Sequence, residues 1–351
     1  MSAHRIGLIG CGGIASAWIR AVAEHDDCEF DWVFDLDADA AARRAEETSA
    51  TVATDLASGL ASADIDMVVI GTPTSSHPGL VAQAAAAGKH VMCEKPMALG
   101  LDDCQAMIDA CATAGVQLAI GHSLRFWGAF LKSRRLIADG AIGTPVSGSI
   151  DRLGSAKARQ EDTAAATPDH WRNDPANTGG HALEGFIHEL DFTRCVFGDV
   201  AAVSCEIGEE RVVEGYVSPQ IIQGVVTFAQ GAVVTTRTGS TVGVPTRGYW
   251  IAGSEGGLRF DGWGGPIELY RRDADEVEHV ECEQVYAYHL ELEDLTDAID
   301  GHKERPENDG INGLRNIGLG LALYRAYETG ARVNFTDGLA DLPEGYRNTK
   351  Y

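Results

Sequence analysis

The feature that most constrains the fold is a regular alternation of short apolar strands and helices over residues 4–121. The first strand, Arg5–Ile9, runs directly into the glycine turn Gly10–Ala15, and Ser16–Glu24 then has the pattern of a helix. Later strands and helices are expected at Phe30–Phe34, Asp66–Ile70, Leu80–Ala87, His90–Cys93, Leu101–Ala114 and Val116–Ile120. Strands that alternate with helices in this way build a parallel, doubly wound α/β sheet.

The glycine turn has the spacing Gly-x-Gly-x-x-Ala of a dinucleotide-binding fingerprint. Gly10 allows the tight turn, and Gly12 lets backbone N–H groups approach a pyrophosphate at the helix N-terminus. Small residues at this spacing also pack helices on strands, so the motif gains its weight from the strand before it and the helix after it. We therefore predict that Gly10, Gly12, Gly13 and Ile14 contact a dinucleotide.

The second expected strand ends in Asp35, 25 residues after the first glycine of the turn. Dinucleotide enzymes place a carboxylate here to bind the adenosine ribose hydroxyls. Leu36 and Asp37 follow, so no basic residue stands beside Asp35 to receive a 2′-phosphate. Asp35 and Leu36 are thus predicted cofactor contacts, and NAD is favoured over NADP. Arg43 and Arg44, on the following helix, are the argument for NADP.

Two further loops follow strands of the expected sheet. One comes after Asp66–Ile70, and the other begins where the apolar run His90–Cys93 ends in Glu94-Lys95-Pro96. Ligands bind outside the carboxyl ends of parallel strands, so both loops are expected at the cofactor. A Lys-Pro pair alone is usually a surface loop, but a lysine beside a dinucleotide can touch the reacting atom. The predicted contacts are Thr72, Pro73, His77, Glu94 and Lys95.

After Gly121 the pattern changes to strands without helices between them, which predicts a largely antiparallel sheet in an α+β domain. The expected strands are Val146–Leu153, Val200–Ile207, Ile221–Ala229, Ala232–Thr238, Tyr249–Ala252 and Ile267–Tyr270, with a hairpin turn at Ala229–Gly231. Helices are expected at Leu124–Ala138, Leu290–Asp300 and Asn312–Thr329, and a polar loop at Gly154–Thr167. The predicted domains are residues 1–122 and 123–351, with the possibility left open that a late helix packs back on the first.

The ionisable residues of the second domain concentrate in Gly179–Asp191. Glu184 and His188 are four residues apart and Asp191 is three further, so on one helix they share a stripe. Such a stripe beside an apolar face is also typical of a solvated edge, so this segment alone decides nothing. The glycine pair that opens it, Gly179-Gly180, indicates close approach of the backbone to another group.

These motifs together resemble those of the glucose-fructose oxidoreductase/inositol dehydrogenase (Gfo/Idh/MocA) family. The matching features are the glycine turn, Thr72-Pro73 with His77, Gly88–Val91 leading into Glu94-Lys95-Pro96, and the later Gly-Gly…His-x-x-Asp segment. They occur in the family's order across most of the chain. The resemblance implies an N-terminal Rossmann domain and a C-terminal domain whose open sheet often forms a subunit interface, and hence a homodimer or homotetramer.

The resemblance also implies roles for particular residues. Lys95 matches the motif lysine and His188 the proposed catalytic base, while Glu184 stands where the family more often has aspartate. The implied substrate contacts are Lys95, Arg125, His170, Trp171, Glu184, His188 and Asp191. The expected function is NAD-dependent oxidation of a ring hydroxyl of a neutral cyclitol or sugar, as in inositol 2-dehydrogenase. The alternative is a pyranose or glycoside dehydrogenase, anhydrosugars included.

Composition and motifs disfavour several other classes of protein. Lys and Arg number 28 against 52 Asp and Glu, a formal charge of −24, which disfavours nucleic acid and anionic membranes. No apolar run approaches the roughly 18 residues needed to span a bilayer, and the chain begins directly with a strand, so a cytoplasmic location is expected. No metal is expected, because a metal-dependent hydrolase or lyase gives Asp35 and Lys95 no role. A non-catalytic dinucleotide sensor would not need both Lys95 and His188.

Overall fold

The computed structural model describes residues 3–155, 174–213 and 216–351. Within it the chain divides into two compact units. The first consists of Met1–Ser123 and Tyr286–Leu314, and the second of Leu124–Val285 and Arg315–Tyr351. The segment Tyr286–Leu314 therefore belongs with the N-terminal part of the chain.

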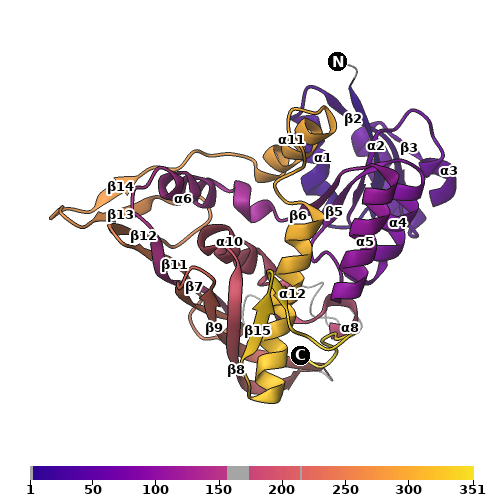
Figure 1. The fold of residues 1–351 in the computed structure, drawn as a ribbon. Helices are drawn as coiled ribbons and strands as arrows, with labels where there is room; N and C mark the ends of the chain where they lie inside the picture. The colour runs from indigo at the N-terminus through magenta and orange to yellow at the C-terminus, as the bar shows by residue number, and fades with distance from the viewer. Residues whose placement is uncertain (1–2, 156–173, 214–215) are drawn as a thin grey trace. The chain divides into compact units, whose positions relative to one another are not determined.

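The first unit is built on a six-stranded parallel sheet with the order β3-β2-β1-β4-β5-β6 (Figure 1). Its strands are β1 (His4–Ile9), β2 (Cys28–Phe34), β3 (Thr51–Val52), β4 (Met67–Ile70), β5 (His90–Glu94) and β6 (Leu118–Gly121). The strand order reverses direction between β1 and β4, which is the point where doubly wound sheets bind ligands. This arrangement confirms the predicted Rossmann class.

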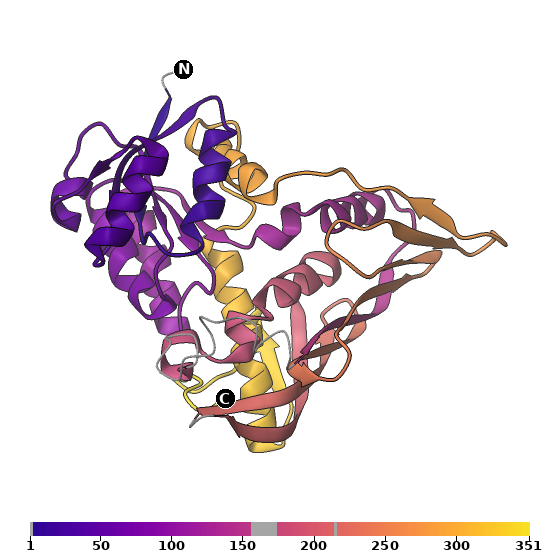
Figure 2. The ribbon, with the colours of Figure 1, turned by 180° about the vertical axis from the view of Figure 1, so that it is seen from behind.

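Helices cover both faces of this sheet, because right-handed crossovers that run in opposite directions from β1 and β4 lie on opposite sides (Figures 1 and 2). One core contains side chains of α1 (Ala15–Ala23), α2 (Ala38–Thr48) and α11 (Ala287–Ile299), such as Trp18, Ala41 and Leu292. The remaining helices are α3 (Leu56–Leu60), the short 3₁₀ helix η1 (Thr74–Ser76), α4 (His77–Ala86) and α5 (Leu101–Ala114). The bounds of α5 equal those predicted, since Gly115 ends it in the left-handed region at φ 69°.

The second unit contains a ten-stranded sheet with the order β14-β13-β12-β11-β7-β10-β9-β8-β15-β16. All neighbouring strands are antiparallel except β7 and β10. The predicted hairpin at Ala229–Gly231 joins β9 to β10 as expected, with Gly231 at φ 95°. The strands are β7 (Pro145–Ser155), β8 (Val200–Val213), β9 (Tyr216–Phe228), β10 (Val233–Val242), β11 (Thr246–Gly253), β12 (Gly256–Phe260), β13 (Ile267–Arg271), β14 (Glu278–Val280), β15 (Val333–Thr336) and β16 (Leu339–Ala340).

One face of this sheet is covered by helices through an aromatic cluster. The ring of Phe130 lies 4.7 Å from Phe192, 4.8 Å from Tyr249 and 5.3 Å from Phe260, measured between ring centroids. All four side chains are buried, and edge-to-face aromatic pairs of this kind add about 0.5–1.5 kcal/mol each beyond their burial. The helices that belong wholly or partly to this unit are the 3₁₀ helix η2 (Ser123–Phe126), α6 (Gly128–Ala138), α8 (Pro175–Thr178), α9 (His181–Glu184), α10 (Ile187–Phe197) and α12 (Gly310–Thr329); η2 and α12 have residues in both units.

Two predicted helices are interrupted. The helix expected at Leu124–Ala138 is divided at Trp127, whose backbone is extended, because Gly128 packs so tightly that an added Cβ would lie 2.4 Å from the Glu283 carbonyl oxygen. The helical stripe expected from Glu184 to Asp191 is divided as well, because α9 ends at Glu184 and α10 begins at Ile187. The prediction that all three ionisable residues share one helix is therefore wrong.

Candidate active site

The glycine turn lies between the end of β1 and the start of α1, as predicted. Gly10 has φ 96°, and a Cβ added to it would lie 2.8 Å from the carbonyl carbon of Gly71, so only glycine suits this position. A Cβ added to Gly12 or Gly13 would meet no atom within 4 Å, so both glycines face open space. An open backbone turn at a helix N-terminus fits the pyrophosphate of a dinucleotide.

Asp35 is tied to this turn. Its carboxylate accepts a hydrogen bond from the Cys11 backbone N–H at 2.7 Å and another from the Asp37 N–H at 2.9 Å. Leu36 beside it is 95% exposed. Arg44 donates to the Gly12 carbonyl at 3.0 Å and to Glu47 at 2.6 Å. This arginine therefore stabilises the backbone of the glycine turn.

His77 joins the two loops that follow β4 and β5. Its imidazole is completely buried; Nε2 lies 2.9 Å from the Thr72 carbonyl oxygen and Nδ1 lies 3.0 Å from that of Pro96. The His77 ring therefore connects the backbone of the loop after β4 to the backbone of the loop after β5, at the edge of the sheet where the cofactor is predicted to bind. Sequence reasoning placed His77 at the cofactor but did not foresee that its side chain would link Thr72 to the Lys95 turn.

Glu94 anchors the lysine turn. Glu94 is 5% exposed, and its carboxylate accepts from the Trp18 indole N–H at 2.9 Å and from the Lys95 backbone N–H at 3.1 Å. Trp18 lies in α1, the helix that begins at the glycine turn. Glu94 thus connects the backbone of half-buried Lys95 to the cofactor-binding helix, and the Lys95–Pro96 peptide bond is cis.

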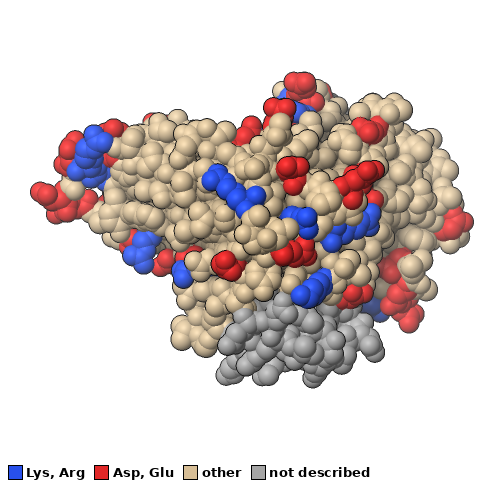
Figure 3. Space-filling model, turned by 60° about the horizontal axis from the view of Figure 1, so that its bottom comes forward, with Lys and Arg blue, Asp and Glu red and all other residues tan. Residues whose placement is uncertain are grey.

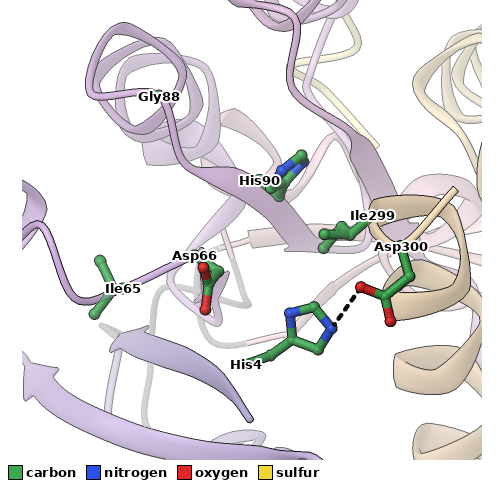
Figure 4. Close-up of a pocket in the computed structure, with 7 residues that line it drawn as sticks. All are labelled: His4, Ile65, Asp66, Gly88, His90, Ile299 and Asp300. Carbon is green, nitrogen blue, oxygen red and sulfur yellow. Dashed lines mark ion pairs between the residues drawn. The ribbon is translucent and has the colours of Figure 1, made fainter. Parts of the chain in front are cut away.

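A cavity of about 450 Å³ lies at the opposite edge of the same sheet (Figure 4). His4 begins β1, His90 begins β5 and Asp66 precedes β4, so these residues mark the amino ends of the strands. His4 and Asp300 face each other there, with 3.3 Å between Nε2 and Oδ1. Because parallel sheets bind ligands at the carboxyl ends of their strands, we do not assign the cofactor to this cavity.

In the second unit, the break between α9 and α10 leaves Glu184 and His188 half-buried and accessible, whereas Asp191 is completely buried. The guanidinium of Arg152 donates to the Gly185 carbonyl at this break, at 2.7 Å. The Gly185 carbonyl therefore accepts its hydrogen bond from a side chain of β7. A side-chain donor at a helix end satisfies backbone groups that have no partner within the helix.

Arg152 belongs to a buried network that sequence reasoning missed. Its guanidinium lies 3.1 Å from a carboxylate oxygen of Glu189, which is completely buried and also accepts from the Tyr249 hydroxyl at 3.1 Å. Trp263 in turn donates to that hydroxyl at 3.3 Å. Burial raises the pKa of Glu189, and Arg152 opposes the shift. The signal in the sequence was the alternation of β7, which places Arg152 on the same face as buried Ile150.

Asp191 and Arg125 are bonded to each other. The guanidinium forms two hydrogen bonds to the carboxylate, at 2.6 and 2.7 Å, and both side chains are buried. Asn316 of α12 donates to the same carboxylate at 2.6 Å and accepts from Arg194 at 2.6 Å. Burial lowers the pKa of Arg194 to about 10. This network positions α10; contact of Arg125 or Asp191 with substrate stays a prediction.

The other predicted contacts are placed as follows. His170 and Trp171 lie outside the described residues, as does most of the loop expected at Gly154–Thr167. Within the part of the chain that the structure describes, no group of three or more His, Cys, Asp or Glu side chains is arranged to hold a metal ion. Among the same residues no helix is both long and apolar enough to cross a membrane.

Figure 3 shows the charged side chains on one face of the molecule. Among the described residues on that face, acidic and basic side chains are interspersed, and no continuous basic patch is visible. Proteins that bind nucleic acid through its phosphates present clustered Lys and Arg side chains. This face offers no such cluster.

Two family models match the chain. The model described as "Oxidoreductase family, NAD-binding Rossmann fold" matches residues 4–122, and that of the GFO/IDH/MocA C-terminal domain matches residues 130–259. The chain belongs to the Gfo/Idh/MocA family. The resemblance recognised in the sequence is thereby confirmed, and so is the two-part fold class. The chain is an NAD(P)-dependent oxidoreductase acting on CH–OH groups.

Known relatives differ in their substrates. A 1,5-anhydro-D-fructose reductase of Ensifer adhaerens is 29% identical over 96% of this chain and 100% of its own length. An inositol 2-dehydrogenase of Rhizobium meliloti is 31% identical, but the match covers 56% of this chain and 55% of that protein. The solved structure of a levoglucosan dehydrogenase in complex with NADH has a TM-score of 0.85 at 21% identity, covering 95% of this chain and 100% of that one. At that identity the structural likeness concerns the fold alone.

Proposed function

We propose that this protein is an NAD-dependent dehydrogenase that oxidises one secondary hydroxyl on the ring of a neutral cyclitol or sugar. The observation that carries the proposal is the position of Lys95. It follows β5, and the open glycine turn follows β1, so both lie at the carboxyl edge of one parallel sheet. A cation at this edge is placed for chemistry on a molecule beside a bound dinucleotide.

The residues of the first unit fit the dinucleotide. Gly12 and Gly13 leave room for the pyrophosphate in front of α1, whose first turn contains no acidic residue to repel it. Asp35 would accept hydrogen bonds from the ribose hydroxyls. Thr72 and Pro73, in the loop after β4, complete the proposed contacts. Residues 1–122 form the cofactor domain in this proposal and residues 123–351 the substrate domain, except that Tyr286–Leu314 belongs to the first compact unit.

NAD is the proposed cofactor rather than NADP. The Asp35 carboxylate is held in place by two backbone N–H groups and would repel a 2′-phosphate. Arg44, the main candidate to bind that phosphate, already contacts the Gly12 carbonyl and Glu47. Arg43 is exposed on α2. A 2′-phosphate would therefore meet a fixed negative charge before it met a basic side chain.

The proposed reaction removes a proton from the substrate hydroxyl and a hydride from the carbon that bears it. A bound nicotinamide would supply the redox chemistry, as the acceptor of a hydride from the ring carbon. His188, which is half-buried, accepts the hydroxyl proton as the general base. Lys95 donates a hydrogen bond to the substrate oxygen as negative charge develops. Glu184 stabilises the imidazolium that forms. Removing the proton and the hydride leaves a ring ketone.

Within the substrate class we place an inositol first and a pyranose, glycoside or anhydrosugar second. The motif positions of His188, Asp191 and Arg125 motivate the first choice. The relatives support both choices comparably, since they include an inositol dehydrogenase and an anhydrofructose reductase. A neutral substrate accords with the formal charge of −24.

A panel of substrates tests the proposal. The purified protein is mixed with NAD and myo-inositol, glucose, a methyl glycoside or levoglucosan, and formation of NADH is followed by absorbance. Oxidation of at least one of the four is the expected result, and the ratio of their kcat/KM values ranks the two choices. An acyclic polyol and a sugar phosphate serve as controls. Turnover confined to those controls, or NADH binding with no turnover at all, would contradict the proposal.

We also propose a homodimer or homotetramer formed through the sheet of the second unit. The uncovered face of that sheet carries Val225, Val233 and Trp250, which are 41%, 44% and 38% exposed. Their register places all three on the same side, opposite the helices. Light scattering of the native protein and of Trp250→Glu should show a multimer that the variant weakens. A monomeric native protein would contradict the proposal.

A further inference from the structure

The glycine pair that opens the reactive segment packs against a distant part of the same chain, residues Asn348–Tyr351, which we call the docking segment. A Cβ added to Gly180 would lie 1.8 Å from the Tyr351 carbonyl oxygen and 2.4 Å from the Asn348 side-chain nitrogen. Gly180 also has φ 84°. The close backbone approach that the sequence indicates is therefore an approach to the docking segment.

Asn348 forms the centre of this contact. Its side-chain nitrogen donates to the Gly179 carbonyl and to the Tyr351 carbonyl, each at 2.8 Å, and its oxygen accepts from the Tyr351 N–H at 3.2 Å. The side chain is 2% exposed. Both amide protons and the amide oxygen are thus used, which is the full capacity of the donor group. A buried amide with every proton bonded specifies one arrangement of the two segments.

A tyrosine of α12 makes the second connection. The Tyr324 hydroxyl accepts from the Ala182 backbone N–H in the first turn of α9, at 2.8 Å. Its ring lies parallel to that of Tyr351, at 8° with 6.0 Å between centroids, and both residues are buried. The N–H groups in the first turn of a helix have no partner within the helix, so this hydroxyl acts as the cap that α9 otherwise lacks.

We propose that the docking segment positions α9, and through it Glu184, for the reaction with His188 of α10; this inference rests on the proposed function. A helix of four residues has too few internal hydrogen bonds to hold its own direction. Its direction is set by what binds its ends. The docking segment and Tyr324 hold the beginning at Gly179 and Ala182, and Arg152 holds the end at Gly185.

Asn348 and Tyr351 are accordingly positioning residues that need not touch substrate. Loss of either would leave the cofactor residues of the first unit unchanged, while Glu184 at the end of α9 would occupy several orientations relative to His188 of α10. A misplacement of about 1 Å in a catalytic group can cost about 10²-fold in rate. The effect should therefore fall on kcat and on its pH dependence rather than on cofactor affinity.

The test uses Asn348→Ala and Tyr351→Ala in the full chain. Tyr351→Phe is the matched control, because it removes the hydroxyl that accepts from the neighbouring Lys350 at 2.7 Å and keeps the ring that stacks on Tyr324. Hydrogen exchange of the Ala182–Gly185 amides is measured first, since it requires no turnover. We expect faster exchange in both alanine variants and native exchange in Tyr351→Phe. Unchanged exchange in the alanine variants would overturn the docking itself.

Kinetics then test the positioning role. We expect kcat to fall about tenfold or more in both alanine variants, with a shifted pH profile of kcat and an unchanged Kd for NADH. Faster exchange together with native kcat and a native pH profile would overturn the proposal and leave a purely structural contact. Should an alanine variant fail to fold, Tyr324→Phe removes only the hydroxyl that caps α9, and the same outcomes apply. Inactivity of the native protein would contradict the proposed function alone, because exchange would still report on the docking.

Discussion

The carboxyl edge of the six-stranded sheet and the α9–α10 segment carry the two sets of proposed reactive residues, and they are held by different means. At the sheet edge, Gly10, Asp35 and Lys95 each follow directly on a strand, and the parallel ladder sets their positions. At α9–α10, Glu184 and His188 depend on side chains from distant parts of the chain, including Arg152, Asn316 and Asn348. Sites built on regular elements tolerate changes in distant residues better than sites that depend on long-range contacts.

Removal of one reactive residue from each region is expected to have the largest effect. We expect Lys95→Ala and His188→Ala each to lower kcat by about 10²–10⁴-fold, the usual contribution of a group that transfers or stabilises a proton. Affinity for NADH, measured by fluorescence titration, should remain near native in both. Near-native turnover in either variant on the best substrate of the panel would show that its residue has another role.

The dependence of α10 on long-range contacts predicts a large loss of stability in Arg125→Ala. The change leaves the Asp191 carboxylate buried without its two guanidinium hydrogen bonds, which costs about 3–5 kcal/mol of unfolding free energy. Arg271→Ala is the matched control, because Arg271 and Glu278 form an exposed pair at 3.2 Å that is worth about 0–1 kcal/mol. Urea unfolding followed by circular dichroism compares them. Equal losses in the two variants would refute the distinction.

The sheet edge can be altered locally, which predicts a change in cofactor preference without a change elsewhere. Asp35→Ser combined with Leu36→Arg should lower kcat/KM for NAD by about 10–100-fold, since a charge-assisted hydrogen bond contributes about 1.5–3 kcal/mol. The efficiency with NADP should rise. Leu36→Arg alone serves as the control, because Leu36 is exposed and Asp35 remains. An unchanged NAD-to-NADP ratio in the double variant would contradict the assignment of Asp35.

The smallest expected effect is at the opposite edge of the same sheet. Burial lowers the pKa of His90, and its Nδ1 accepts from the Gln117 N–H at 2.9 Å, so the folded protein favours the neutral ring. Nearby Asp66 opposes this shift and His4 adds to it. The stabilisation is therefore complete above the ordinary pKa of 6.5 and is lost as the pH falls through the lowered value.

His90→Asn tests this pH dependence, because an asparagine oxygen can accept the same N–H without titrating. The free energy of unfolding of the variant should vary less between pH 7 and pH 5 than that of the native protein, while kcat stays native. Identical pH profiles of stability would show that His90 does not titrate in this range. A fall in kcat would show that the two edges of the sheet are not independent.

The amino-acid sequence alone determined the parallel sheet, the glycine turn and the positions of Asp35 and Lys95. These features depend on the order of neighbouring residues, because a buried strand, a glycine and a helix within about 20 positions leave few ways to fold. The bounds of α5 could be predicted to the residue for the same reason. The family, too, could be recognised from local motifs in their order.

Only the tertiary structure decided what holds the second set of residues. The spacing of Glu184, His188 and Asp191 suits one helix, yet the chain breaks at Gly185, where Arg152 takes the carbonyl. Asp191 and Arg125 form hydrogen bonds with each other. The glycine pair packs against Asn348, which lies 168 residues after Gly180 in the chain. Contacts between residues so far apart leave no periodic signal in the sequence, because each depends on where two separately folded elements meet.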